Sequence, residues 1–194
     1  VTFSCMGNSE AAIESCKQAL KIKPDYAEAH FQMGIALDKT GNLEAAINSY
    51  KQAIKIKPDY AEAHNNMAVA FNDTGNSEAA IESCKRALKI KPDHDNAYIN
   101  IGIALKHVRF SKPESDLQEI IVSLLTRKNL VRPIDISRAG ISLLKLEPVI
   151  KELFQKHSAG DLNHSFEKLA SSLQDIPLLL KLMSVCPLTD LELE

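Results

Sequence analysis

Apolar residues in the first half of the chain recur at three- and four-residue spacing, the pattern of amphipathic helices. One such stripe consists of Ala46, Ile47, Tyr50, Ala53 and Ile54. A similar stripe runs along the segment before it, from Ala29 to Leu37. The pattern predicts helices at about residues 24–40, 43–57, 60–74 and 77–91, arranged as antiparallel pairs.

Turn residues stand between these stripes. Gly41 follows one predicted helix and can take the left-handed conformation that ends it, and Asn42 can cap the next helix. Pro58 cannot continue a helix, so it ends the second one. Asp59 and Glu62 have the spacing of a capping box, which predicts the start of the following helix. Asp25 and Glu28 have the same spacing.

These landmarks repeat with a period of 34 residues. The repeated positions are Gly7, Gly41 and Gly75; Asn8, Asn42 and Asn76; Pro24, Pro58 and Pro92; and the small residues Gly34, Ala68 and Gly102. A small residue midway along the first helix, a glycine turn, paired alanines and a closing proline resemble the tetratricopeptide repeat. The resemblance implies an all-α, right-handed superhelical solenoid of antiparallel helix pairs, followed by a diverged helical segment.

The period divides the chain into a partial repeat at 1–26, full repeats at 27–60 and 61–94, and the first helix of a further repeat at 95–108. Residues 109–194 continue as predicted helices without the period. We expect a capping box at Ser111 and Glu114, a helix break at Pro133, and helices over 136–146, 148–154, 161–173 and 176–185. This segment is either a cap for the array or a connector to another domain.

The two ends suggest a piece of a longer protein. Val1 falls inside a repeat, and Thr189 with Glu192 gives a helix-start signal just before the last residue. A second resemblance lies in SLLKLEPVIKEL and LLLKLMSVCPLTDLELE, which are similar to linkers in bacterial proteins where tetratricopeptide repeats precede a methyltransferase, sulfotransferase or glycosyltransferase. That resemblance implies a catalytic domain beyond Glu194.

Composition narrows the function. The formal net charge is −2 and aromatic residues make up 5% of the chain, which argues against nucleic acid or an anionic membrane as the partner. The four cysteines form no CxxC pair, and free thiols favour a reducing, cytoplasmic location. We find no catalytic, cofactor or metal motif, and we expect no small-molecule substrate. His30 and His64 are one repeat apart, too far to share a metal ion.

The resemblance implies that a protein or peptide partner binds along the concave face formed by the first helices. The implied groove residues are Phe31, Gln32, Ile35, Asn65, Asn66, Val69, Ile99, Asn100 and Ile103. The lysine and asparagine positions of the carboxylate clamp found in chaperone adaptors are not matched. Gln32, Asn66 and Asn100 instead resemble the asparagine ladder of O-linked N-acetylglucosamine transferase, whose amides pair with a peptide backbone. The alternative is that polar residues simply occupy an exposed face.

Overall fold

The computed structural model describes residues 2–127, 130–148, 150–151, 173 and 176–185, and every regular element among them is a helix. The chain divides into two compact units, Val1–Ala104 and Leu105–Glu194. Each unit is described by itself. The division of the chain at residue 108 and the assignment of the individual repeats stay predictions.

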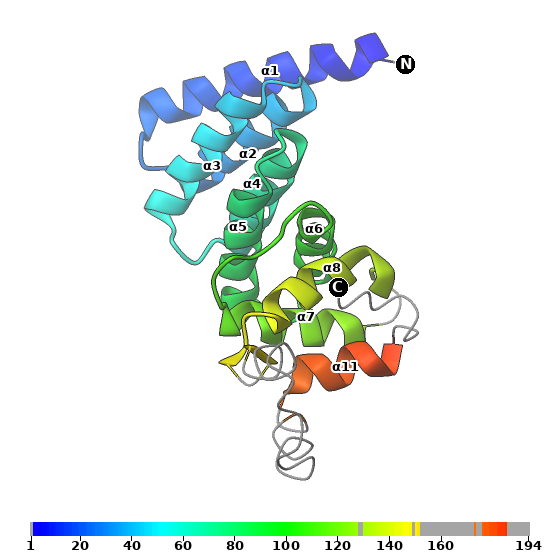
Figure 1. Cartoon of the computed structure of the whole chain (residues 1–194). Helices are drawn as coiled ribbons and strands as arrows, with labels where there is room; N and C mark the ends of the chain where they lie inside the picture. Colours follow the sequence, from blue (N-terminus) through cyan, green and yellow to red (C-terminus); the bar gives the residue numbers. More distant parts are fainter. Residues whose placement is uncertain (1, 128–129, 149, 152–172, 174–175, 186–194) are drawn as a thin grey trace, which may run out of the picture. The chain divides into compact units, whose positions relative to one another are not determined.

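Helices of the first unit follow one another in the order of the chain. They are α1 (Thr2–Ile22), α2 (Ala27–Lys39), α3 (Leu43–Ile56), α4 (Ala61–Asp73), α5 (Ser77–Ile90) and α6 (Asp95–Leu105). Each of α1 to α4 packs against the next helix, and α2 also contacts α4, so the first helices of these two repeats are neighbours (Figure 1). The predicted pairs and the all-helical solenoid are therefore confirmed, with helix boundaries within three residues of the predicted ones.

Glycine turns separate the two helices of each full repeat. Gly41 and Gly75 both have φ of 77°, a conformation that residues with a Cβ adopt only at a cost. The backbone N–H of Asn42 donates to the carbonyl of Leu37 over 2.9 Å, which closes α2. Asn76 caps α5 as predicted, because its side chain accepts from the Ala79 N–H at 3.1 Å. Asn42 holds the equivalent N-cap position without that side-chain bond.

Three local predictions are wrong. The N-cap residues of α2 and α4 are Tyr26 and Tyr60, so the aspartates before them stand one residue too early to form capping boxes. Gly7 does not form a turn, because α1 runs through it without a break. Only six residues precede Gly7, too few for a separate first helix, and they extend the second helix of that repeat instead.

Small and large side chains alternate across the α2–α3 contact. Tyr50 is fully buried, and a Cβ added at Gly34 would lie 2.5 Å from its Cε1 atom, closer than atoms can approach without displacement. In the next repeat the equivalent residues are Ala68 and Cys84, both fully buried. A slightly larger residue on the first helix thus accompanies a much smaller one on the second, so each repeat fills the same space in a different way.

In the second unit an apolar core lies between α7 (Ser115–Thr126), α8 (Pro133–Leu144) and α11 (Pro177–Val185). All three pack against one another. Their fully buried side chains include Leu117, Ile121, Leu143, Leu178 and Leu182. This stretch therefore has a core of its own although it has lost the repeat pattern.

The helix starts in the second unit differ in part from the predicted ones. Glu114 is the N-cap of α7, so the capping box at Ser111 is wrong; residues 111–112 form a bend. Pro133 occupies the first turn of α8, where its missing N–H costs nothing. The helix predicted to begin at Pro148 is present at residues 148 and 150–151. Its remainder, most of 161–173 and the signal at Thr189 and Glu192 lie outside the described residues.

Candidate functional site

The predicted groove residues lie on the three first helices, α2, α4 and α6. Gln32 and Ile103 are exposed, and Ile103 keeps 43% of its surface accessible. The half-exposed members are Ile35, Asn66, Val69, Ile99 and Asn100. We call these seven accessible residues the first-helix face. They combine amides with aliphatic side chains, which can hydrogen-bond a peptide backbone and cover its apolar side chains.

Phe31 does not belong to this face. It is 9% exposed and lies in the cluster that contains Tyr50 and Ala46. Its ring centroid is 4.7 Å from that of Tyr60 and 6.0 Å from that of Tyr50, so it packs against α3 and against the N-cap residue of α4. Phe31 therefore supports the groove from behind. The family resemblance implied a solvent-facing position for Phe31, whereas the structure buries it.

Asn65 is also buried, at 5% exposed, and its amide organises its neighbours. The Asn65 Nδ2 donates to Asn66 Oδ1 over 3.3 Å, and Asn100 Nδ2 donates to Asn65 Oδ1 over 2.9 Å. Asn72 Nδ2 donates to the backbone carbonyl of Asn100 over 3.0 Å. These bonds connect α4 to α6 and hold two of the predicted ladder amides in place. Some of the amide groups that the sequence predicts to bind a peptide thus form hydrogen bonds within the protein.

A pocket of about 380 Å³ lies between α1 and α2. Its lining consists of Asn8, Ser9, Ala12, Gln32, Ile35, Ala36 and Lys39. Gln32 and Ile35 therefore face a hollow large enough for a side chain of a bound peptide. The contribution of α1 was missed, although Asn8 and Ala12 carry the 34-residue period and could have been placed by it.

An acidic group lies on the same helices. Asp38, near the end of α2, is half-buried, and Asp73 ends α4. Burial raises the pKa of the Asp38 carboxyl, and the negative charge of Asp73 raises it further. Burial also raises the pKa of Tyr50, and the charge of Asp38 adds to that effect, while the Asn66 amide opposes it. Asp38 thus interacts electrostatically with both Asp73 and Tyr50.

His30 and His64 each bond to the loop that precedes their own helix. Each Nε2–H donates to a proline carbonyl six residues earlier, Pro24 and Pro58 respectively, over 3.1 Å. Both Nδ1 atoms are buried without a hydrogen-bond partner among the described residues. In the same part of the chain, no group of three histidine, cysteine or acidic side chains is placed to hold a metal ion.

Acidification should weaken the array through His64. Burial lowers the pKa of His64; the Pro58 carbonyl opposes this and the charge of Arg86 adds to it. Because the folded pKa lies below the unfolded value of about 6.5, stability is complete above pH 6.5 and falls as pH decreases toward the folded pKa. We expect the urea midpoint to fall between pH 7 and pH 5, and to fall less in His64→Tyr, which copies Tyr98 of the next repeat. An equal pH dependence in both proteins would contradict this role.

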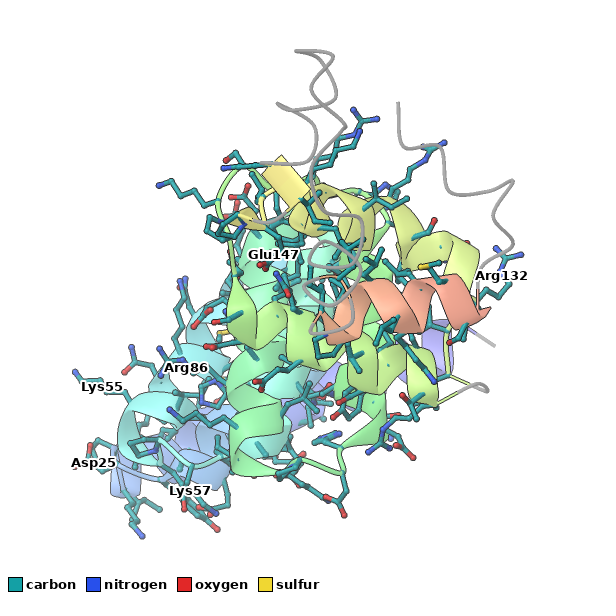
Figure 2. The ribbon with its side chains drawn as sticks, turned by 60° about the horizontal axis from the view of Figure 1, so that its bottom comes forward. Asp25, Lys55, Lys57, Arg86, Arg132 and Glu147 are labelled. Carbon is teal, nitrogen blue, oxygen red and sulfur yellow. The ribbon has the colours of Figure 1, made fainter. Side chains whose placement is uncertain are left out.

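The second helices carry a different surface. Figure 2 shows Lys55, Lys57 and Arg86 on this part of the molecule, and all three are exposed. Lys57 Nζ lies 4.7 Å from the Tyr60 ring centroid, and Arg86 pairs with Glu82 over 3.1 Å, as its spacing predicts. These contacts match a solvated ridge of the kind that covers many repeat proteins.

Stacked helix pairs with polar and apolar side chains on their first helices define the class of helical-repeat solenoids. A sequence profile described as TPR repeat matches residues 6–41 and 39–75, and one described as tetratricopeptide repeat matches residues 61–94. Residues 6–94 are therefore tetratricopeptide repeats. A search of curated proteins finds no match. No described helix is both long and apolar enough to cross a membrane.

Several solved structures share this arrangement. A mutant of the O-GlcNAc transferase of Thermobaculum terrenum is 25% identical with a TM-score of 0.53, over 64% of this chain and 24% of the transferase. A structure of MamA is 20% identical with a TM-score of 0.53, over 92% and 88% of the two chains. MamA of Desulfovibrio magneticus RS-1 is 16% identical with a TM-score of 0.52, over 93% and 91%. The two MamA likenesses show the fold alone, and this chain spans about a quarter of the transferase.

Proposed function

We propose that this chain is a protein-interaction module that binds an extended peptide or flexible tail of a partner protein along the first-helix face. The observation that carries the proposal is the accessible row of amides and aliphatic residues on neighbouring first helices. Gln32 is free to reach solvent, and Asn66 is half-exposed beside the buried Asn65. Amides at a regular spacing suit the repeating donors and acceptors of a peptide backbone.

Hydrogen bonds from the amides alone would give a peptide only modest affinity for this groove. Each net hydrogen bond contributes about 0.5–1.5 kcal/mol, so a few amides support only weak binding unless apolar contacts add to them. Ile35 and Val69 lie beside the amides and supply such contacts, and the pocket of about 380 Å³ next to Gln32 can receive a side chain. The partner's apolar residues would then select it among peptides with the same backbone. The cytoplasmic location is part of this proposal.

The experiment is a pulldown from host lysate with the purified chain and two matched double variants. We expect Gln32→Ala/Asn66→Ala to lose most of the captured partner, because each lost hydrogen bond weakens binding about two- to tenfold. Lys55→Ala/Lys57→Ala removes two exposed side chains from the second helix and should capture as much as the wild type. Circular dichroism confirms that all three proteins are folded.

Loss of the partner in the lysine variant alone would move the binding surface to the second helices and refute the proposed groove. Asn100 is unsuitable for this test because its amide and carbonyl connect α6 to α4. An Asn100 variant would mix a change in folding with a change in binding.

A second candidate function is the recruitment of substrates to a transferase domain of the same protein. The likeness to an O-GlcNAc transferase at 25% identity favours it, as do the linker-like segments of the second unit. The purified chain alone should then transfer no methyl, sulfate or sugar group. A catalytic domain with a βαβ pattern and a glycine-rich turn beyond Glu194 in the gene would support this candidate, and turnover by the chain itself would contradict it.

A further inference from the structure

Helix α1 leaves open a stripe of side chains that the later second helices bury. By the 34-residue period α1 is equivalent to α3 and α5, and it lies at one end of the first unit (Figure 1). Ala46 and Ala80 have no exposed surface, whereas the equivalent Ala12 is exposed. Ala12 is joined by three half-exposed residues whose equivalents are all buried: Ile13, Cys16 and Ala19. We call these four residues the open stripe.

The chain contains a second copy of this stripe, and there a helix covers it. Residues 7–25 and 75–93 are identical except that Gln18 stands where the later segment has Arg86. The later segment forms α5, and α4 packs against it. Because α1 presents the same side chains in the same order, we expect a helix with the residue pattern of α4 to fit it.

Close contact within a helix pair depends on one small residue at the centre of the first helix. In the α2–α3 pair, a Cβ added at Gly34 would lie 2.5 Å from Tyr50 Cε1, so glycine is required opposite tyrosine. In the α4–α5 pair the equivalent residues are Ala68 and Cys84, both fully buried. Since α1 has Cys16 at this position, the matching residue of a covering helix is alanine.

The open stripe also borders the pocket between α1 and α2. Ala12 lines that pocket of about 380 Å³ together with Ile35 and Lys39. A helix that lay on α1 as α2 lies on α3 would meet α2 as well, because α2 and α4 contact each other at the equivalent step. A single covering helix would therefore contact both the stripe and the rim of the pocket.

We propose that the open stripe of α1 binds an amphipathic helix of a partner protein, one with the residue pattern of α4 and an alanine at the position of Ala68. Burial of the four stripe residues against this helix removes apolar surface from water and so favours the complex. This inference goes beyond the proposed function, because it adds a second interaction surface that recognises a folded helix instead of an extended peptide.

The test uses the whole chain and a fluorescein-labelled synthetic peptide with the sequence of residues 58–76, which contains α4 and its flanking turns. We expect saturable binding by fluorescence polarisation. Ala68→Tyr in the peptide should weaken binding about tenfold or more, because it overpacks the close contact with Cys16. Gln18→Arg in the chain copies α5 at the one position where the two segments differ, and it should leave binding unchanged.

An exchange of the two kinds of pair tests whether the peptide lies on α1. Cys16→Tyr copies Tyr50 at a half-exposed position of the chain, where a larger side chain is tolerated. This variant should prefer an Ala68→Gly peptide, whereas the wild-type chain should prefer the unchanged peptide. Glycine lowers the helix propensity of the peptide equally for both proteins, so only a contact at residue 16 reverses the preference.

The same order of preference in both proteins would overturn the proposal, since the peptide would then bind elsewhere, for example by displacing α4 from α5. Absence of binding by the unchanged peptide would also overturn it. Analytical ultracentrifugation tests the other occupant: self-association of the wild-type chain that Cys16→Tyr abolishes would assign the stripe to a second copy and refute the partner helix. The Ala68→Tyr peptide keeps the test decisive if the Cys16 variant fails to fold, because it is measured on the wild-type chain.

Discussion

Replacing Gly34 with alanine should destabilise the array by about 1–3 kcal/mol, because the new Cβ meets the ring of a residue that cannot move aside. It would lie 2.5 Å from Tyr50 Cε1 and 2.6 Å from Cδ1, and Tyr50 is fully buried. Urea unfolding followed by circular dichroism measures the loss. The substitution places alanine in a helix, where its intrinsic propensity is better than that of glycine. A loss of stability would therefore come from the steric clash with Tyr50 and not from the helix propensity of the backbone.

The neighbouring repeat supplies the control. There the same two positions hold Ala68 and Cys84, both buried. Tyr50→Cys alone should leave a cavity, whereas Gly34→Ala/Tyr50→Cys rebuilds the pairing of the next repeat. The double variant should lose less free energy than the sum of the two single variants, by more than about 0.5 kcal/mol. Additive losses would show that the two side chains do not compete for the same space.

Replacing Asn65 with alanine should lower the free energy of unfolding by about 1–3 kcal/mol, since a buried amide network loses its centre. Asn65 is 5% exposed, bonds to Asn66 and accepts from Asn100, so its removal leaves the Asn100 amide without that acceptor. Gln32→Ala is the matched control: it also removes an amide from a first helix, but Gln32 is exposed. Its effect on stability should stay within about 0.5 kcal/mol. Equal losses would mean that the network contributes no more than a surface amide.

Substitutions of these two amides also distinguish an effect on folding from an effect on binding. If Asn65 holds the groove together and Gln32 contacts the partner, Asn65→Ala should shift the melting curve, and Gln32→Ala should shift the binding curve. The roles are distinguishable because burial differs while the chemistry of the side chain does not. The amide ladder that the sequence predicts thus divides into side chains that organise the face and side chains that reach solvent.

Local features of the repeat were predictable from the sequence. The helices, their order and the turns at Gly41 and Gly75 follow from hydrophobic spacing and from the need for a positive φ, both of which act over a few residues. The 34-residue period placed equivalent residues on equivalent helices and so indicated the first helices as the candidate binding face. The capping boxes at Asp25 and Asp59 failed because helix starts depend on one residue of register, which spacing alone does not settle.

Only the tertiary structure decided which residues of that face reach solvent. Phe31 and Gln32 are adjacent in sequence, but stacking against Tyr50 and Tyr60 buries Phe31 and leaves Gln32 exposed. Periodicity gives the direction of a side chain from its own helix axis, not how closely the next helix covers it.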